Sequence, residues 1–293
     1  MAGWWITGYN LEEIWKTTKG ENIRVAVLDT GINRHVDFDF SKIQGYDYIN
    51  KSANFITDIK GHGTHCAGII NANGTVNQGV APGASMFIAK VCGIAGNVDF
   101  NALKNALTDI YNETNNATQI DILNMSFTLV GAESDKPIIK DIENLLTKIS
   151  AEKGCLLVAA SGDDDYPDSD VNNYSPARLN ECICVGSVGP TNKRSEFSTK
   201  TVNMDVMAPG EAILSSANTN GTIALSGTSM STAYISGICA LGLSLMKTLK
   251  NKTDRELIKK ALYQTAFSDN FPLVEYGHGI VVPQKFIDTL KTF

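Results

Sequence analysis

Short apolar runs alternate with longer amphipathic stretches along most of the 293 residues of this chain. Apolar runs of about four to eight residues, rich in Val and Ile, are typical of buried strands, whereas apolar residues repeated every three or four positions are typical of helices. Runs of the first kind lie at 23–28, 86–91, 120–124, 156–160, 182–188 and 202–206. Helical stretches lie at 11–18, 62–72, 100–115, 137–153, 229–249, 253–265 and 283–290.

This alternation predicts βαβ units, in which parallel strands form one sheet and helices cover both of its faces. We therefore expect an α/β protein with three layers and a doubly wound, mainly parallel sheet. A hydrophobic content of 43% can fill a complete core, and no linker or internal repeat divides the chain, so residues 1–293 are expected to form a single domain. Thr253 and Glu256 have the spacing of a capping box, which predicts a helix start at Thr253.

Composition narrows the possible partners. The net charge is −6 and no basic patch stands out, so no nucleic acid is expected to bind. The apolar stretch 235–246 is too short to span a bilayer and the N-terminus lacks the regions of a signal peptide, so we expect no membrane span. We also expect the protein to be a monomer. Such a protein is cytoplasmic if the chain is complete, or secreted if it is a trimmed mature domain. Six cysteines inside apolar runs favour a reducing compartment.

Three polar blocks stand beside predicted elements. Asp29-Thr30-Gly31 ends the first strand, His62-Gly63-Thr64-His65 opens a helix, and Gly227-Thr228-Ser229-Met230 opens the longest helix. A serine hydroxyl becomes a good nucleophile when a histidine takes its proton and a carboxylate orients the imidazolium. The ends of parallel strands and the first turns of helices are places where active sites lie. The blocks therefore predict a nucleophilic hydrolase.

These blocks, their flanks and their Asp, His, Ser order resemble the subtilisin-like serine proteases, or subtilases. The resemblance covers nearly the whole chain. It implies a serine endopeptidase that acts on polypeptides through an acyl-enzyme, with Ser229 as nucleophile, His62 as proton carrier and Asp29 as its orienting group. It also implies that the chemistry needs no cofactor. Further segments similar to the family are Gly79-Val80-Ala81-Pro82-Gly83-Ala84, Ile122-Leu123-Asn124-Met125-Ser126, Asn173-Tyr174-Ser175-Pro176-Ala177, Phe197-Ser198 and Met207-Ala208-Pro209-Gly210.

The resemblance also implies a substrate groove. In the family an extended substrate pairs with two segments, which here are Gly96-Asn97-Val98 and Ser126-Phe127-Thr128. Thr128 stands where the family has a glycine, and its side chain would narrow the groove. The alternative is that both segments are only strand ends. Three side chains would line an apolar pocket, although the second is equally suited to the core: Phe100, Leu103 and Phe127.

Asp163 is the sharpest departure from the family, which has an asparagine there. That amide donates a hydrogen bond to the oxyanion, whereas an ionised carboxylate only accepts. A protonated Asp163 could donate one bond, and burial beside Asp164 and Asp165 would favour that form. The Ser229 backbone N–H and the Thr228 hydroxyl are expected to remain as oxyanion donors. We expect a slower or more pH-dependent protease; the alternative is a catalytically weak or inactive peptide-binding protein with this fold.

The sequence does not decide whether the protein binds a metal ion. The acidic run 163–170 suggests calcium or a preference for basic substrate residues, or else is a solvated loop. Asp37 matches an acid that helps hold a structural calcium in many family members, although the loop 73–77 is shorter than the usual calcium loop. Cys66 lies one helical turn after His62 and on the same face, which predicts sensitivity to thiol reagents.

Overall fold

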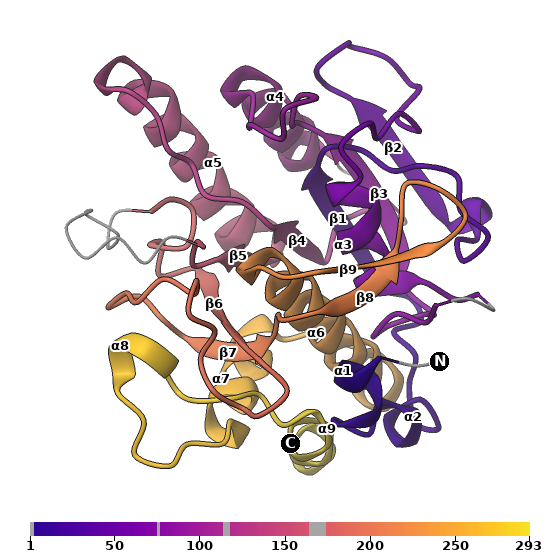
Figure 1. Ribbon diagram of the computed structural model, residues 1–293, viewed down its shortest axis with the longest axis vertical. Coiled ribbons are helices and arrows are strands. Elements are labelled where there is room, and N and C mark those ends of the chain that lie inside the picture. The colour runs from indigo at the N-terminus through magenta and orange to yellow at the C-terminus, as the bar shows by residue number, and fades with distance from the viewer. Residues whose placement is uncertain (1–2, 75–76, 114–117, 164–173) are drawn as a thin grey trace.

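One parallel sheet of seven strands organises the computed structural model, which describes residues 3–74, 77–113, 118–163 and 174–293 (Figure 1). The strand order is β2-β3-β1-β4-β5-β6-β7, and every neighbouring pair runs parallel. Two further strands, β8 and β9, form a separate antiparallel hairpin. The strands are β1 (Arg24–Asp29), β2 (Ile43–Asp47), β3 (Ser85–Lys90), β4 (Ile122–Met125), β5 (Leu156–Ala160), β6 (Cys182–Val188), β7 (Val206–Pro209), β8 (Ile213–Ser216) and β9 (Thr222–Leu225).

Helices cover both faces of the sheet, as the sequence predicts. Alternate residues of β1 point to opposite faces: Val25 and Val27 join the core that contains α3 and α6, while Ala26 and Leu28 join the core that contains α4 and α5. The fold is therefore a three-layer α/β fold. The helices are α1 (Trp4–Thr7), α2 (Leu11–Ile14), α3 (His62–Asn71), α4 (Phe100–Asn112), α5 (Lys136–Lys153), α6 (Thr228–Lys250), α7 (Arg255–Thr265), α8 (Leu273–Tyr276) and α9 (Pro283–Thr292), with 3-10 turns at Phe40–Lys42 and Glu133–Asp135.

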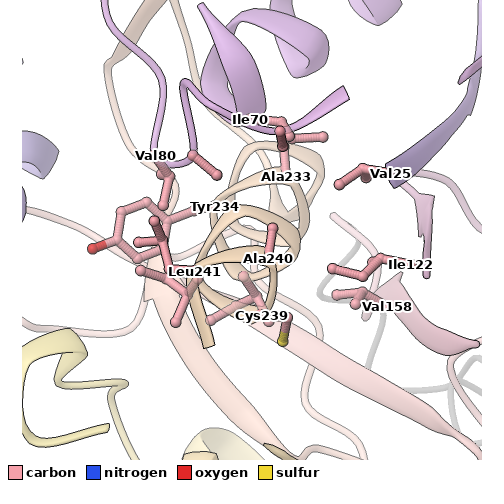
Figure 2. Close-up of a cluster of buried hydrophobic side chains, with 14 of the residues drawn as sticks. Val25, Ile70, Val80, Ile122, Val158, Ala233, Tyr234, Cys239, Ala240 and Leu241 are labelled. Atoms are coloured by element: carbon pink, nitrogen blue, oxygen red, sulfur yellow. The ribbon is translucent and has the colours of Figure 1, made fainter. Parts of the chain in front are cut away.

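Helix α6 is the central helix of one core. Figure 2 shows Val25, Ile122 and Val158, from three adjacent strands, on one side of it, with Ile70 of α3 close by. The helix has 23 residues, and by length and composition alone it is apolar enough to cross a membrane, which the shorter apolar stretch 235–246 does not indicate by itself. Yet 94% of its most apolar window is buried inside the protein. Its hydrophobicity thus belongs to the core.

Some element boundaries differ from the sequence prediction. The run expected as a strand at 202–206 is mostly a turn and β7 begins only at Val206, because Val202 is 70% exposed and does not enter the sheet. The capping box at Thr253 was also wrong. The carboxylate of Asp254 instead accepts the backbone N–H of Leu257 at 3.0 Å, so α7 begins two residues later. The predicted helix end at 114–115 lies outside the described residues.

Candidate active site

Asp29 lies at the middle of the sheet edge. It is the last residue of β1, whose neighbours β3 and β4 lead to opposite halves of the sheet. In open α/β sheets, this reversal of strand order leaves a crevice at the carboxyl ends of the strands, where ligands bind. The Asp29 side chain is almost fully buried, and its Oδ1 accepts the backbone N–H of Thr30 at 2.7 Å. The carboxylate is therefore held in one orientation at the crevice.

His62 opens α3 directly beside this carboxylate. Gly61 caps the helix with a φ of 85°, a left-handed conformation that suits glycine. The Nδ1 atom of His62 lies 2.8 Å from Oδ1 and 2.9 Å from Oδ2 of Asp29. Burial opposes protonation of the imidazole, but the Asp29 charge and hydrogen bond outweigh it and raise the pKa of His62 well above its usual value. The two residues form the carboxylate–imidazole pair that the sequence predicts.

Ser229 lies in the first turn of α6, where backbone N–H groups have no acceptor within the helix. Its hydroxyl donates to the carbonyl of Ser126 at 2.8 Å, and the Ser126 hydroxyl donates back to the Ser229 carbonyl at 2.9 Å. Among the hydrogen bonds of the described residues, none joins Ser229 Oγ to His62. In this conformation the proton of the Ser229 hydroxyl is directed to the Ser126 carbonyl.

Asp163 reaches the start of α6 from the loop after β5. Its Oδ1 accepts the backbone N–H of Thr228 at 2.6 Å and the Thr228 hydroxyl at 2.7 Å. Gly227, the N-cap residue, has no side chain to cap the helix, so Asp163 satisfies the first amide and places a negative charge at the positive end of the helix dipole. Asp163 is exposed, so the expected burial was wrong. The Thr228 hydroxyl, expected to face an oxyanion, is bound to the carboxylate.

The two predicted groove segments lie at the ends of β3 and β4. In the first, Gly96 has a φ of 92°, Val98 bridges Cys92 in antiparallel fashion, and the Asn97 carbonyl accepts the Gly93 N–H at 3.0 Å. Asn97 is exposed in this turn. The second segment directly follows β4.

Within the second segment, Ser126 is buried while Phe127 and Thr128 are half-buried. Of the side chains expected to line an apolar pocket, Leu103 is fully buried in the core beneath α4. Phe100 and Phe127 are partly buried against the same core. Leu103 is thus a core residue. Phe100 and Phe127 are the two residues of the three that could line an apolar pocket.

Comparison with known proteins agrees with this geometry. The family model described as the subtilase family matches residues 20–279. The chain belongs to the subtilase family. It is 35% identical over 271 residues to the major intracellular serine protease of Bacillus subtilis (strain 168), an alignment that covers 89% of this chain and 80% of the relative. This subtilase is 32% identical to subtilisin DY of Bacillus licheniformis (90% of each chain) and 32% identical to the intracellular serine protease of Paenibacillus polymyxa (89% and 77%). It is a subtilisin-like serine endopeptidase.

Cys66 lies beneath the imidazole of this subtilase. Its Sγ is 4.0 Å from His62 Nδ1, so the prediction of a shared helix face is confirmed. All six cysteines are free and buried, and burial raises the pKa of the Cys66 thiol. Among the described residues, the cluster of potential metal ligands comprises Asp29, His62 and Cys66, which is the carboxylate–imidazole pair itself with the thiol below it. We expect reaction with thiol reagents at this site to be slow.

Structural calcium stays a prediction. Asp37 is buried, and the loop backbone folds onto it through a hydrogen bond from the Asn73 N–H to the Asp37 carbonyl at 2.8 Å. His35 Nδ1 lies 3.4 Å from Asp37 Oδ2. Ca²⁺ takes about six to eight oxygen ligands, of which Asp37 would supply one. The remainder of that loop, at 75–76, and most of the acidic run, at 164–170, lie outside the described residues.

Asp58 and Lys90 contact the segments that carry Asp29 and His62, although the sequence analysis did not single them out. Both are buried charged residues. Asp58 binds the start of α3, and an acid just before a helix is a recognisable capping signal. Lys90 had no such signal, because a lysine that ends an apolar strand looks like a solvent-exposed residue in the sequence.

Proposed function

We propose that Asp29, His62 and Ser229 are the catalytic triad of this endopeptidase. The Ser229 hydroxyl attacks the peptide carbonyl, His62 takes its proton and passes it to the leaving amine, and water then hydrolyses the acyl-enzyme. Asp29 keeps the Nδ1 proton of His62 in place, so that the other ring nitrogen is the base. The observation that carries this proposal is the bidentate contact of His62 Nδ1 with Asp29 at 2.8 and 2.9 Å.

We further propose that Asp163 slows the reaction. A carboxylate at the oxyanion position repels the developing negative charge and also occupies the Thr228 hydroxyl through the 2.7 Å hydrogen bond. The Ser229 backbone N–H is then the principal oxyanion donor. Protonation of Asp163 at low pH would remove the negative charge and add a donor at its second oxygen, which gives the activity an additional dependence on pH.

A peptide-binding protein with little or no turnover is the second candidate. Two contacts favour it: the Ser229 hydroxyl donates to Ser126 at 2.8 Å, and the Thr228 hydroxyl donates to Asp163. Both groups are thus turned away from the positions that catalysis requires. The groove formed by 96–98 and 126–128 would still pair with an extended polypeptide.

A fluorophosphonate probe distinguishes the two candidates, because it labels a serine only when that serine is activated. For the endopeptidase we expect one label per folded chain, located at Ser229 by peptide mapping. Ser229→Ala is expected to abolish the label, and His62→Ala to slow it strongly. A folded wild-type protein that takes up no label would support the binding protein and contradict the triad.

We also propose a monomer with one domain over residues 1–293. The single seven-stranded sheet, with α9 near the C-terminus packed on α6, supports one domain. Light scattering is expected to give a mass near the 31.6 kDa of the chain. The six free cysteines, and the intracellular relatives, favour a reducing compartment.

A further inference from the structure

Asp58 is a buried carboxylate held between the two segments that carry the carboxylate and the imidazole of the proposed triad. Its exposed fraction is 1%. Oδ1 accepts the Thr30 hydroxyl at 2.8 Å and the Gly61 N–H at 2.7 Å. Oδ2 accepts the N–H of Thr64 at 2.8 Å and its hydroxyl at 2.6 Å. Both oxygens therefore have two donors each, and the donors come from the end of β1 and the start of α3.

Thr30 connects this carboxylate to the pair itself. Its backbone N–H donates to Asp29 Oδ1 at 2.7 Å, while its hydroxyl donates to Asp58 and accepts the Gly63 N–H at 2.9 Å. The ammonium of Lys90 donates to the Thr30 carbonyl at 3.0 Å. Thr30 is thus fixed at its N–H, its hydroxyl and its carbonyl. A shift of Asp58 would move the residues that adjoin both Asp29 and the imidazole.

Asn33 holds the backbone of Asp58 through two further hydrogen bonds. Its side-chain oxygen accepts the Asp58 N–H at 3.1 Å and its amide donates to the Asp58 carbonyl at 2.6 Å. Its own N–H donates to the Thr64 hydroxyl at 3.0 Å. Asp58 is therefore held by both backbone and side chain, as a rigid brace between strand and helix.

We propose that Asp58 is a positioning residue that sets the distance and orientation of the Asp29–His62 pair. This inference rests on the proposed triad. Charge-assisted bonds to a buried carboxylate are stronger than bonds between neutral groups, so the ionised form suits four donors. An asparagine of the same shape would turn an NH₂ group toward the backbone N–H of Gly61 or of Thr64. The hydrogen bond from that backbone N–H must then be lost.

The first test is Asp58→Asn, assayed with a peptide substrate and with the fluorophosphonate probe. Misplacement of catalytic groups by about 1 Å can cost on the order of 100-fold, so we expect kcat to fall about 10- to 100-fold while KM changes less than about 2-fold. A weaker pair stabilises the imidazolium less, so the acid limb of the pH profile is expected to move to lower pH. Asp254→Asn is the matched control, because Asp254 caps α7 outside the site.

The second test separates positioning from folding. Thr30→Val removes the hydroxyl at constant shape, and Thr30→Ser keeps it. We expect the valine variant to lose kcat as Asp58→Asn does, the serine variant to stay within about 3-fold of wild type, and the double variant Asp58→Asn/Thr30→Val to be non-additive. A folded Asp58→Asn with the wild-type kcat and pH profile would overturn the proposal, as would equal kcat for the two Thr30 variants. Absence of labelling in wild type would instead overturn the triad.

Discussion

At the scale of single residues, Asp163 differs at one terminal group from the asparagine that the resemblance to the family implies at this position. Asp163 and an asparagine have the same shape, and either can accept the N–H and hydroxyl of Thr228 through one oxygen. They differ at the second position, where asparagine has an NH₂ donor and aspartate has an oxygen. The capping of α6 and the stabilisation of an oxyanion can therefore be separated by substitution.

Asp163→Asn is expected to raise kcat by about 100- to 1,000-fold, the loss that a family member shows without this donor. The melting temperature should change little, because the amide oxygen still caps Thr228. Asp163→Ala is the control: it removes the repulsion and the cap, so we expect a lower melting temperature and a smaller gain in kcat. No gain in kcat for Asp163→Asn would contradict the proposed attenuation.

A second prediction concerns the protonation of His62. Burial alone would favour its neutral form, but Asp29 raises its pKa well above 6.5. Only the neutral imidazole can take the Ser229 proton, so kcat/KM is expected to rise with pH through that raised pKa and to be low below it. In Asp29→Asn the rise of kcat/KM with pH should occur at lower pH, and kcat should fall by about 10,000-fold. A pH profile with the same limb in both proteins would contradict the role of Asp29.

At the scale of elements, helix α3 is anchored at its far side to the hairpin of β8 and β9. His65 Nε2 lies 3.0 Å from the carbonyl of Ile213 and 3.1 Å from that of Ile223, one on each strand. The Ser215 hydroxyl donates to the His65 carbonyl at 2.9 Å. Burial lowers the pKa of His65 to about 4, so the ring is neutral and donates through Nε2. The helix that begins with His62 is therefore held from two directions.

This anchor predicts an acid-labile contribution to stability. Between about pH 6.5 and 4 the unfolded chain binds a proton at His65 that the folded chain does not, so the free energy of unfolding falls as pH decreases through that window and levels off below it. The full effect is roughly 3 kcal/mol, from about 1.4 kcal/mol per pKa unit. Urea unfolding of wild type and His65→Gln at pH 7 and 4.5 measures it. The difference between the two proteins should shrink at pH 4.5; equal differences at both values would contradict the assignment.

The elements that could be predicted from the sequence are those whose apolar residues are buried in the core. The strand ending at Asp29, the helix opening at His62 and the helix containing Ser229 all appear within one residue of their expected bounds. Strand β2 was missed because Gln44, Gly45 and Asp47 interrupt its apolar run. Strand β8 was missed because two of its four residues are serines, and β9 because it is a four-residue run at exposed or half-exposed positions. The strand expected at 202–206 begins only at Val206, because Val202 is 70% exposed, although Met204 and Val206 are buried.

At the scale of the whole molecule, the places of the candidate site residues in the fold were predictable from the sequence, but their contacts were not. Motif residues at the ends of strands and helices could be placed from the chain, because parallel strands bring their carboxyl ends to one edge. That Ser229 faces Ser126, and that Asp163 binds Thr228, depends on side-chain rotation across segments far apart in sequence. No local pattern encodes such pairings.

The position of β1 in the middle of the sheet also bears on synthesis. Its carboxylate is made early, at residue 29, but the serine arrives only with residue 229, on a helix that must then cover one face of the finished sheet. A chain emerging from the ribosome therefore lacks the proposed nucleophile until all nine described strands have been made, and lacks a buried α6 for longer. With Ser229 as the nucleophile, a nascent chain that ends before this residue carries no peptidase activity.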